Sequence, residues 1–457
     1  MSIPILLVVP PSAPLAHASA TVLSMHLKST AKDIAPPLAF HLPGFTLNTA
    51  FAAVPLARKH NVLSDGFAMA ATDRGLGSAG YVVQGSVPDE KALAALDAAT
   101  KEQFGRQAVF ADPVIAGFPV CGGTPPVGNT AAVQQQLDSG RINALGMAGA
   151  NTAIAIFDTG INQAHLTTRG VNPAAVNSTL FWTATVGGSA GNSAVGHGTM
   201  CAYDALIAAP AAQLLDFPIL QSLPASPVVI GGVLSNALQA YNYVNLNFYA
   251  LAPALRPFQR LVLNNSWGVF DPAWDFPAGH PGRYIDNPAH PFNQLVGTLA
   301  AAGADILFAA GNCGPTCPDG RCRNSTSIMG ANSHPDVICV GGVDVNGSLA
   351  GYSSHGPGML TPAKPDLVAY THFDGSQAFG VGSADSGTSA ACPVMAGVIA
   401  PLRSAATAPT GNPRPQLVQA LLSNATRNGP AGHQLDDGWG TVDLNFITNL
   451  QSALNIV

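Results

Sequence analysis

Four short segments of this 457-residue chain carry side chains suited to acid–base and nucleophilic chemistry. They centre on Asp158, His197, Asn312 and Ser389, in that order. A serine hydroxyl is a weak nucleophile that needs a base within hydrogen-bond reach, and an imidazole titrating near neutrality is such a base. A buried carboxylate fixes the tautomer of that imidazole, and an amide N–H stabilises an oxyanion. The four residues therefore predict acyl transfer through Ser389.

Each of these residues also has an ordinary structural interpretation when it is taken alone. Asp158 and Asn312 are typical of turns after strands, whereas His197 and Ser389 lie where helices begin. Their order provides the stronger argument, because Asp, then His, then Ser is one of three known chain orders for this kind of triad. We therefore interpret the four as one site, with Asn312 as the oxyanion donor.

The elements that position these residues begin near residue 131, where apolar strands start to alternate with helices. This alternation predicts an α/β domain with a mostly parallel sheet and helices on both faces, and a site beyond the carboxyl ends of the strands. We expect strands at 153–157, 261–263, 306–310 and 337–340, and helices at 197–208, 228–244, 291–302 and 389–400.

The N-terminal part of the chain has a different organisation. Residues 81–112 predict a small β–α–β unit, and we assign 1–117 to an N-terminal α+β region, 118–130 to a Gly- and Pro-rich linker and 131–457 to the main domain. Residues 1–20 read as an ordinary first strand or as a cleaved signal peptide that lacks the usual Lys or Arg. Localisation, secreted or cytoplasmic, stays open.

Composition excludes several classes of protein. Charged residues make up 10% of the chain, and Lys+Arg number 19 against 25 Asp+Glu, so no basic surplus predicts a nucleic-acid partner. A hydrophobic content of 47% argues against disorder. Apolar runs such as 3–9 are far shorter than the ~18 residues of a membrane span, so we expect none.

The seven cysteines leave several interpretations open. Cys313, Cys317 and Cys322 lie close in the sequence and are consistent with a disulfide that holds a loop, with free thiols or with a zinc site of unusual spacing. Cys201 follows His197 by one turn, and Cys392 follows Ser389 by three residues. These two cysteines could be buried small side chains that fill the core, or they could make the activity sensitive to thiol reagents.

The motifs around the four residues resemble the signature blocks of the subtilases, the family of subtilisin-like serine peptidases. The blocks are Asp-Thr-Gly-Ile at 158–161, His-Gly-Thr at 197–199, Ala-Ala-Gly-Asn at 309–312 and Gly-Thr-Ser-Ala-Ala-Cys-Pro at 387–393. Weaker agreement extends the resemblance over about 140–445. It implies a three-layer αβα fold, a serine endopeptidase acting on proteins or peptides, and a triad of Asp158, His197 and Ser389.

The resemblance also implies roles for other parts of the chain. The expected substrate-binding residues are Ser266, Trp267, Gly268, Ala309, Ala310 and Gly311. The N-terminal region corresponds in position to a propeptide, which would act as an intramolecular inhibitor. No cofactor or metal is required, and calcium at the family's site is doubtful because the usual aspartate after Gly160 is missing. Trp267 could equally be a packed core aromatic.

Three alternatives stay open at this point. The same residues would serve a processing protease or peptide ligase dedicated to one partner peptide, and the scaffold would also suit a non-catalytic binding module. A sedolisin-type acid peptidase uses a similar serine motif but lacks the His-Gly-Thr block. The Pro-rich insertion at 269–291 either shapes access to the site or covers surface.

Overall fold

The computed structural model describes most of the chain as two compact units. The described residues are 2–10, 42–57, 78–117, 124–144, 146–184, 187–221, 231–251, 253–318, 322, 328–405, 414–427 and 430–453. One unit comprises residues 1–114, 233–256 and 272–298, and the other comprises 115–232, 257–271 and 299–457.

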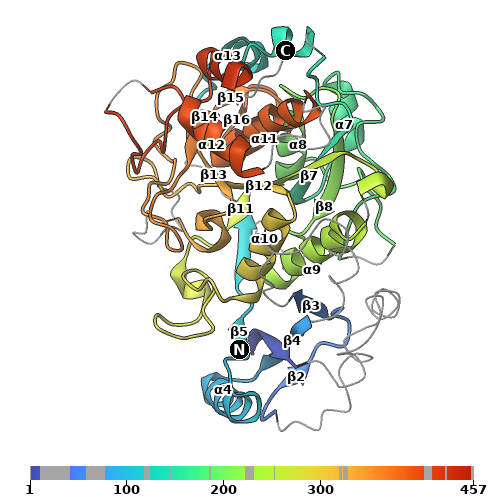
Figure 1. Ribbon diagram of the computed structural model, residues 1–457, viewed down its shortest axis with the longest axis vertical. Coiled ribbons are helices and arrows are strands. Elements are labelled where there is room, and N and C mark those ends of the chain that lie inside the picture. The colour runs from blue at the N-terminus through green and yellow to red at the C-terminus, as the bar shows by residue number, and fades with distance from the viewer. Residues whose placement is uncertain are drawn as a thin grey trace. The chain divides into compact units, whose positions relative to one another are not determined.

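The larger unit contains the predicted parallel sheet (Figure 1). Its six strands are all parallel and follow the order β14-β13-β12-β10-β7-β8. They are β7 (Thr152–Asp158), β8 (Gln213–Pro218), β10 (Arg260–Asn265), β12 (Asp305–Ala309), β13 (Ile338–Val343) and β14 (Leu367–Tyr370). Strands β7, β12, β13 and β14 are buried throughout, which explains their continuous apolar runs. The sequence predicted four of these strands to within three residues at each end, and the α/β fold class is confirmed.

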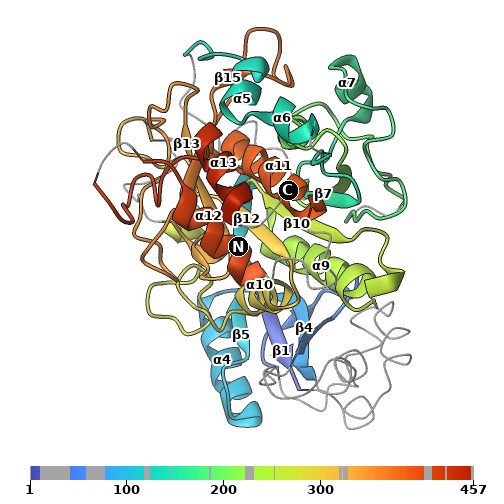
Figure 2. The same ribbon diagram turned by 45° about the horizontal axis from the view of Figure 1, so that its top comes forward.

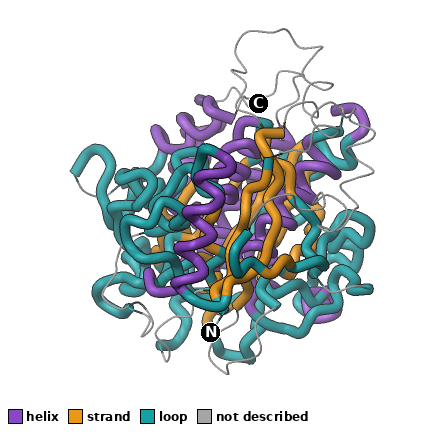
Figure 3. The backbone as a smooth tube through the Cα atoms, turned by 90° about the horizontal axis from the view of Figure 1, so that it is seen from below, coloured by secondary structure: helices purple, strands orange, loops and turns teal. Residues whose placement is uncertain are grey.

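Helices alternate with these strands along the chain, as parallel pairing requires. They include α7 (Gln163–Thr168), α8 (His197–Ala205), α9 (Leu234–Val244), α10 (Pro291–Ala301) and α11 (Thr388–Ala405). Helix α11 packs along five strands of the sheet and against α8. A Cβ atom on Gly397 would lie only 2.3 Å from the Ala205 carbonyl oxygen, so this glycine lets α11 approach α8 closely. Figure 3 shows the strands running side by side with helices beside them.

A second, three-stranded sheet has the order β11-β6-β9. It comprises β6 (Val114–Gly117), β9 (Gly231–Val233) and β11 (Trp267–Gly268). Residues 114–117, which directly precede the predicted linker, form the central strand here, although no strand was predicted at this position. Their pairing partners lie more than 100 residues away in sequence, which explains why local composition did not reveal the strand.

The smaller unit contains an antiparallel sheet with the order β2-β4-β1-β5, and β3 pairs with β4. Its strands are β1 (Ile3–Val9), β2 (Thr46–Leu47), β3 (Val54–Ala57), β4 (Ser78–Val87) and β5 (Val109–Ala111). The predicted helix is α4 (Glu90–Phe104), which begins because the Asp89 side chain accepts a hydrogen bond from the Ala92 N–H. The strand interpretation of the N-terminus is thus correct for residues 3–9.

Most of the Pro-rich insertion belongs to this smaller unit. Its Phe276 side chain joins the hydrophobic core formed by the N-terminal strands and α4. The Gly282 carbonyl accepts a hydrogen bond from the Ala111 N–H of β5 (2.9 Å), and the His290 ring bonds the Ala111 carbonyl (2.9 Å). The insertion therefore covers β5, an outcome that neither sequence-based interpretation specified.

The remaining helices and short elements complete the described structure. In the larger unit, α12 packs against α13 (Figure 2). The elements not yet given are α5 (Thr130–Gln136), α6 (Ser139–Ala144), α12 (Arg414–Asn424), α13 (Leu444–Ala453), β15 (Phe373–Asp374), β16 (Ala384–Asp385) and the short helices Asn245–Tyr249, Pro253–Leu255, Pro272–Trp274 and η4 (Gly330–Ser333). Among the described residues, no helix has the length and apolar character needed to cross a membrane.

Candidate active site

Asp158 and His197 meet at the carboxyl end of the parallel sheet. Asp158 is the last residue of β7, and His197 is the first residue of α8. The His197 Nδ1 atom lies 2.8 Å from Asp158 Oδ1 and 2.9 Å from Oδ2. The carboxylate is fully buried and also accepts the Thr159 N–H at 2.7 Å. This geometry holds the imidazole with Nδ1 protonated and directs Nε2 away from the carboxylate.

The electrostatic surroundings favour protonation of His197. Burial by itself would lower the pKa of this imidazole, but the charge of Asp158 and its hydrogen bond act in the opposite direction. Their combined effect leaves the pKa of His197 above its ordinary value of 6.5. The pair therefore has the properties of a general base whose imidazolium form is stabilised.

Ser389 lies in the first turn of α11 and is fully buried. Its Oγ donates a hydrogen bond to the Ser266 carbonyl oxygen at 3.4 Å, and its own carbonyl accepts the Ser266 hydroxyl at 3.0 Å. The His197 Nε2 atom is buried and has no hydrogen-bond partner among the described residues. The structure thus brings Asp158 and His197 together but does not form the Ser389–His197 hydrogen bond.

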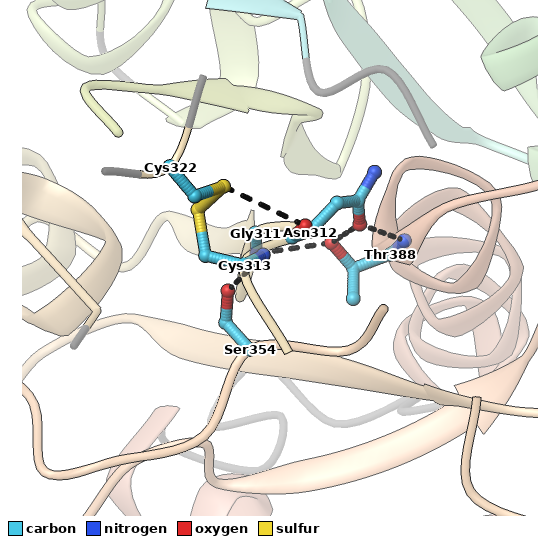
Figure 4. The surroundings of a disulfide bond; sticks show 6 residues. All are labelled: Gly311, Asn312, Cys313, Cys322, Ser354 and Thr388. Carbon is cyan, nitrogen blue, oxygen red and sulfur yellow. Dashed lines mark hydrogen bonds between the residues drawn. A yellow bond between two sulfur atoms is a disulfide. The ribbon is translucent and has the colours of Figure 1, made fainter. Parts of the chain in front are cut away.

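Asn312 is held by the residue that precedes the serine (Figure 4). The Asn312 Oδ1 atom accepts the Thr388 N–H at 2.9 Å and the Thr388 hydroxyl at 3.1 Å. The Thr388 hydroxyl oxygen in turn accepts the Gly311 N–H at 3.0 Å. These bonds fix the plane of the Asn312 amide relative to the start of α11. Thr388 lies within the Gly-Thr-Ser block, but no role was predicted for it from the sequence.

A disulfide follows Asn312 directly. Cys313 and Cys322 are bonded with an S–S distance of 2.01 Å, and Cys317 is also disulfide-bonded. The Cys313 N–H donates to the Ser354 hydroxyl at 2.9 Å, as Figure 4 shows. Of the three interpretations of these cysteines, the disulfide is the correct one. It closes the loop that begins beside Asn312.

The expected substrate-binding residues occupy the ends of two neighbouring strands. Trp267 and Gly268 form β11, which pairs with β6, and Ala309 ends β12. Ala310 and Gly311 follow β12, and Gly311 has a φ of +106°, a conformation that favours glycine. Trp267 is fully buried and makes an edge-to-face contact with Phe308 at 5.3 Å between ring centroids. The Trp267 side chain is thus surrounded by other residues, as expected of a packed core aromatic.

Gly117 of β6 is a neighbour of the site that sequence analysis did not single out. A Cβ atom on Gly117 would lie 3.5 Å from Cε1 of His197, which is ordinary van der Waals contact. Gly117 also pairs with Trp267 in the antiparallel ladder. The only sequence signal was the short apolar run at 114–116. The main chain of β6 therefore lies against the imidazole.

Two buried thiols lie beneath the site. Cys201 Sγ is 3.7 Å from Asp158 Oδ2, 3.9 Å from His197 Nδ1 and 3.4 Å from the Ser389 carbonyl oxygen. Burial raises the pKa of both Cys201 and Cys392, so both are neutral thiols. Asp158, His197 and Cys201 are also the one set of three potential metal-ligating side chains found among the described residues. Both carboxylate oxygens of this set already bind the imidazole.

A model of the subtilase family matches residues 149–440. The membrane-bound transcription factor site-1 protease of Mus musculus is 30% identical over 327 residues, which is 68% of this chain and 26% of that protein. The subtilisin-like protease SBT6.1 of Arabidopsis thaliana is 30% identical over 318 residues, or 65% and 26%. This chain therefore matches about a quarter of the length of these relatives.

Among solved structures, a lanthipeptide protease aligns with 70% of this chain and 93% of its own, at 19% identity and a TM-score of 0.48.

Proposed function

Since the chain belongs to the subtilase family, whose members are serine peptidases, we propose that it is an endopeptidase that acts through an acyl-enzyme on Ser389. The observation that carries this proposal is the buried Asp158–His197 pair at the end of β7, in the same unit as Ser389 at the start of α11. The geometry of this pair supports Asp158 as the acid and His197 as the base, and the sequence order supports Ser389 as the nucleophile.

The proposed reaction uses groups of this chain only. Ser389 Oγ attacks the substrate carbonyl carbon while its proton moves to His197 Nε2, and Asp158 stabilises the resulting imidazolium. The Asn312 side chain and the Ser389 N–H stabilise the tetrahedral oxyanion. His197 then protonates the leaving amine as the C–N bond breaks. Water then attacks the acyl carbon while His197 takes one of its protons, and His197 returns that proton to Ser389 Oγ as the ester bond breaks and the acid product leaves. In this scheme no cofactor takes part.

The bond from Ser389 Oγ to the Ser266 carbonyl is compatible with this role. A rotation about the serine χ1 angle redirects Oγ, and catalytic hydrogen bonds often tighten only when substrate binds. The His197 Nε2 atom has no hydrogen-bond partner among the described residues. After this rotation, the Ser389 hydroxyl would donate a hydrogen bond to it.

A fluorophosphonate probe tests the nucleophile. We expect the probe to label Ser389 in the wild-type chain and to leave Ser389→Ala unlabelled, with peptide mapping used to identify the modified residue. Ser376→Ala, which removes another buried serine hydroxyl, is the control and should still be labelled. A folded wild-type protein that takes up no probe would refute the proposal, and it would leave the binding-module alternative.

The proposal extends to the N-terminal region as an intramolecular inhibitor. The support is β6, which pairs through Gly117 and Ala116 with Trp267 and Gly268, two of the expected substrate-binding residues. Peptidases often bind substrate backbone as an added strand. A strand in this position would exclude a substrate from β11.

Two measurements test this inhibitory role. A synthetic peptide of residues 109–117 should inhibit peptide hydrolysis competitively, whereas a peptide of the same composition in scrambled order should not. Self-cleavage is expected between residues 113 and 140 in the wild type and not in Ser389→Ala, as followed by mass spectrometry. A fully active sample that stays at full length throughout would argue against self-removal.

A dedicated processing role is the second candidate, because the matched relatives include a protease named for a membrane-bound transcription factor. A peptide ligase would use the same residues. A peptide-library digest read by mass spectrometry separates these outcomes: many cleaved sequences indicate a general endopeptidase, a single cleaved sequence indicates a processing enzyme, and joined peptides indicate a ligase.

A further inference from the structure

From the contacts at the start of β11 and the carboxyl end of β12, we infer that Asn332 determines which substrate side chains the enzyme accepts next to the scissile bond. This inference rests on the proposed function, because it concerns the same site. It assigns to Asn332 a positioning role: its side-chain amide ties together the two strand ends that flank the substrate side chain.

The chain segments that follow β10 and β12 separate where the pairing of these two strands ends. Residues of β10 and β12 pair in parallel up to Asn265 and Phe308. Beyond this pair the chain from β10 turns into β11, whose Trp267 pairs with Gly117 instead. On the other side, Ala309 remains in register with Val340 of β13. A fork therefore opens between Trp267 and Ala309, directly beside the residues expected to bind substrate.

The side-chain amide of Asn332 lies within this fork. The Nδ2 atom donates one hydrogen bond to the Trp267 carbonyl at 2.8 Å and one to the Ala309 carbonyl at 2.8 Å. The side chain is 2% exposed, so water does not compete for these two carbonyls. Both protons of one amide group are used, and their fixed geometry sets the spacing between the two strand ends.

The turn that carries Asn332 is anchored by hydrogen bonds that do not involve the Asn332 side chain. Asn332 belongs to the short helix η4, whose Ser333 hydroxyl donates to the Gly330 carbonyl and accepts the Leu360 N–H, each at 3.0 Å. Asn332 Oδ1 is buried without a hydrogen-bond donor among the described residues. The amide is thus held only through the two bonds across the fork.

The consequence is a pocket of fixed width for the residue on the amino side of the scissile bond, called P1. Removing the amide deletes side-chain volume at the fork and leaves two carbonyls without their donors. Both effects widen the space between the strands. We therefore expect variants of Asn332 to favour larger P1 side chains than the wild type does.

The test uses three peptide substrates that are identical except for Ala, Leu or Phe at P1. In Asn332→Ala the ratio of kcat/KM for the Phe substrate to that for the Ala substrate should rise about 10-fold over wild type, the scale on which apolar pockets discriminate side chains. Asn332→Ser keeps one hydroxyl donor and should give an intermediate ratio. Each ratio is measured within one preparation, so partial occupancy of the site by β6 affects both substrates alike.

Asn293 provides a matched control. It is also fully buried, its Nδ2 also bridges two carbonyls, those of Tyr284 (3.1 Å) and Asn287 (2.8 Å), and its Oδ1 also lacks a partner among the described residues. It belongs to the smaller unit, whereas Trp267 and Ala309 both belong to the larger one. Asn293→Ala should therefore leave the Phe-to-Ala ratio within about twofold of wild type.

Three outcomes would overturn the inference. The first is an unchanged ratio in Asn332→Ala, the second is an equal loss for all three substrates, and the third is an equal change in Asn293→Ala. If Asn332→Ala does not fold, the ratio for Asn332→Ser decides the question. Fluorophosphonate labelling of Ser389 in every variant separates this failure from failure of the proposed function, since an unlabelled wild type would refute the latter alone.

Discussion

At the scale of single residues, the contact between Asp158 and His197 determines how activity depends on pH. The base must be neutral to accept the serine proton. Because the pKa of His197 is raised above 6.5, the imidazole stays protonated to a higher pH than a free histidine does. Activity is therefore lost as the pH falls through this raised value.

We expect the acid limb of the kcat/KM profile to have its midpoint above pH 6.5. In Asp158→Asn the midpoint should move down, and kcat should fall by about 10⁴-fold, because the amide stabilises neither the correct tautomer nor the imidazolium. The profile is measured with one peptide substrate from pH 5 to 9. Asp336→Asn, which removes a more exposed carboxylate, should keep the wild-type midpoint; an unshifted midpoint in Asp158→Asn would contradict the assignment.

Asn312 carries a second prediction at this scale. Asn312→Asp keeps an oxygen for the two bonds from Thr388 but loses the amide donor. We expect kcat to fall by roughly 10²–10³-fold with little change in KM, because the lost interaction is made in the transition state. Steady-state kinetics with Asn346→Asp, an exposed position, as control would measure this. A loss confined to KM would exclude Asn312 as the oxyanion donor.

At the scale of elements, a pair of buried carboxyl groups links α8 to β16. Asp204 and Asp385 are at most 1% exposed, and the charge of Asp385 adds to burial in raising the pKa of Asp204. Asp385 also accepts the N–H and the hydroxyl of Ser376, and Asp374 is its charged neighbour. Burial is the main cause that raises the pKa of both groups. The link joins the helix of His197 to the strand that leads to Ser389.

The raised pKa values give this link a defined pH dependence. The folded state binds protons here more tightly than the unfolded state, so this stability is present below about pH 4 and is lost as the pH rises through the folded values. In Asp204→Asn the amide needs no proton. We expect this variant to be more stable than wild type at pH 8 and to have no such advantage at pH 4, as measured by urea unfolding. An equal difference at both pH values would contradict a raised pKa of Asp204.

At the scale of the whole molecule, three separate stretches of chain build the smaller unit. The insertion reaches β5 closely because residue 282 is glycine: a Cβ atom there would lie 2.1 Å from the Val109 carbonyl oxygen. The insertion thus takes part in the unit that contains residues 1–114 of the N-terminal region. From its sequence, this insertion could either shape access to the site or cover surface.

We expect Gly282→Ala to push the insertion away from β5. The new Cβ atom would collide with the Val109 carbonyl oxygen, and this backbone atom cannot move aside as easily as a flexible side chain. Amide hydrogen exchange should become faster at Ala111, whose N–H bonds the Gly282 carbonyl. Ala278→Ser, an exposed change in the same insertion, should leave this protection unchanged. Unaltered exchange at Ala111 in Gly282→Ala would show that this close contact does not hold the insertion in place.

The sequence by itself determined the α/β class, most strands of the main sheet and the residue types of the proposed site. These features are encoded locally. A buried strand is visible in the sequence as an apolar run, and Asp158 is recognisable because it ends the run that forms β7. The same holds for His197 and Ser389 at the starts of their helices.

Only the tertiary structure decided what depends on distant contacts. The Cys313–Cys322 pairing, the strand at 114–117 and the packing of the insertion on β5 were each left open or missed. Asn332 shows the reason most clearly, since its amide joins carbonyls 65 and 23 residues away in the chain. No local pattern encodes a partner at such a separation, because the distance between two strand ends is set by how the whole sheet folds.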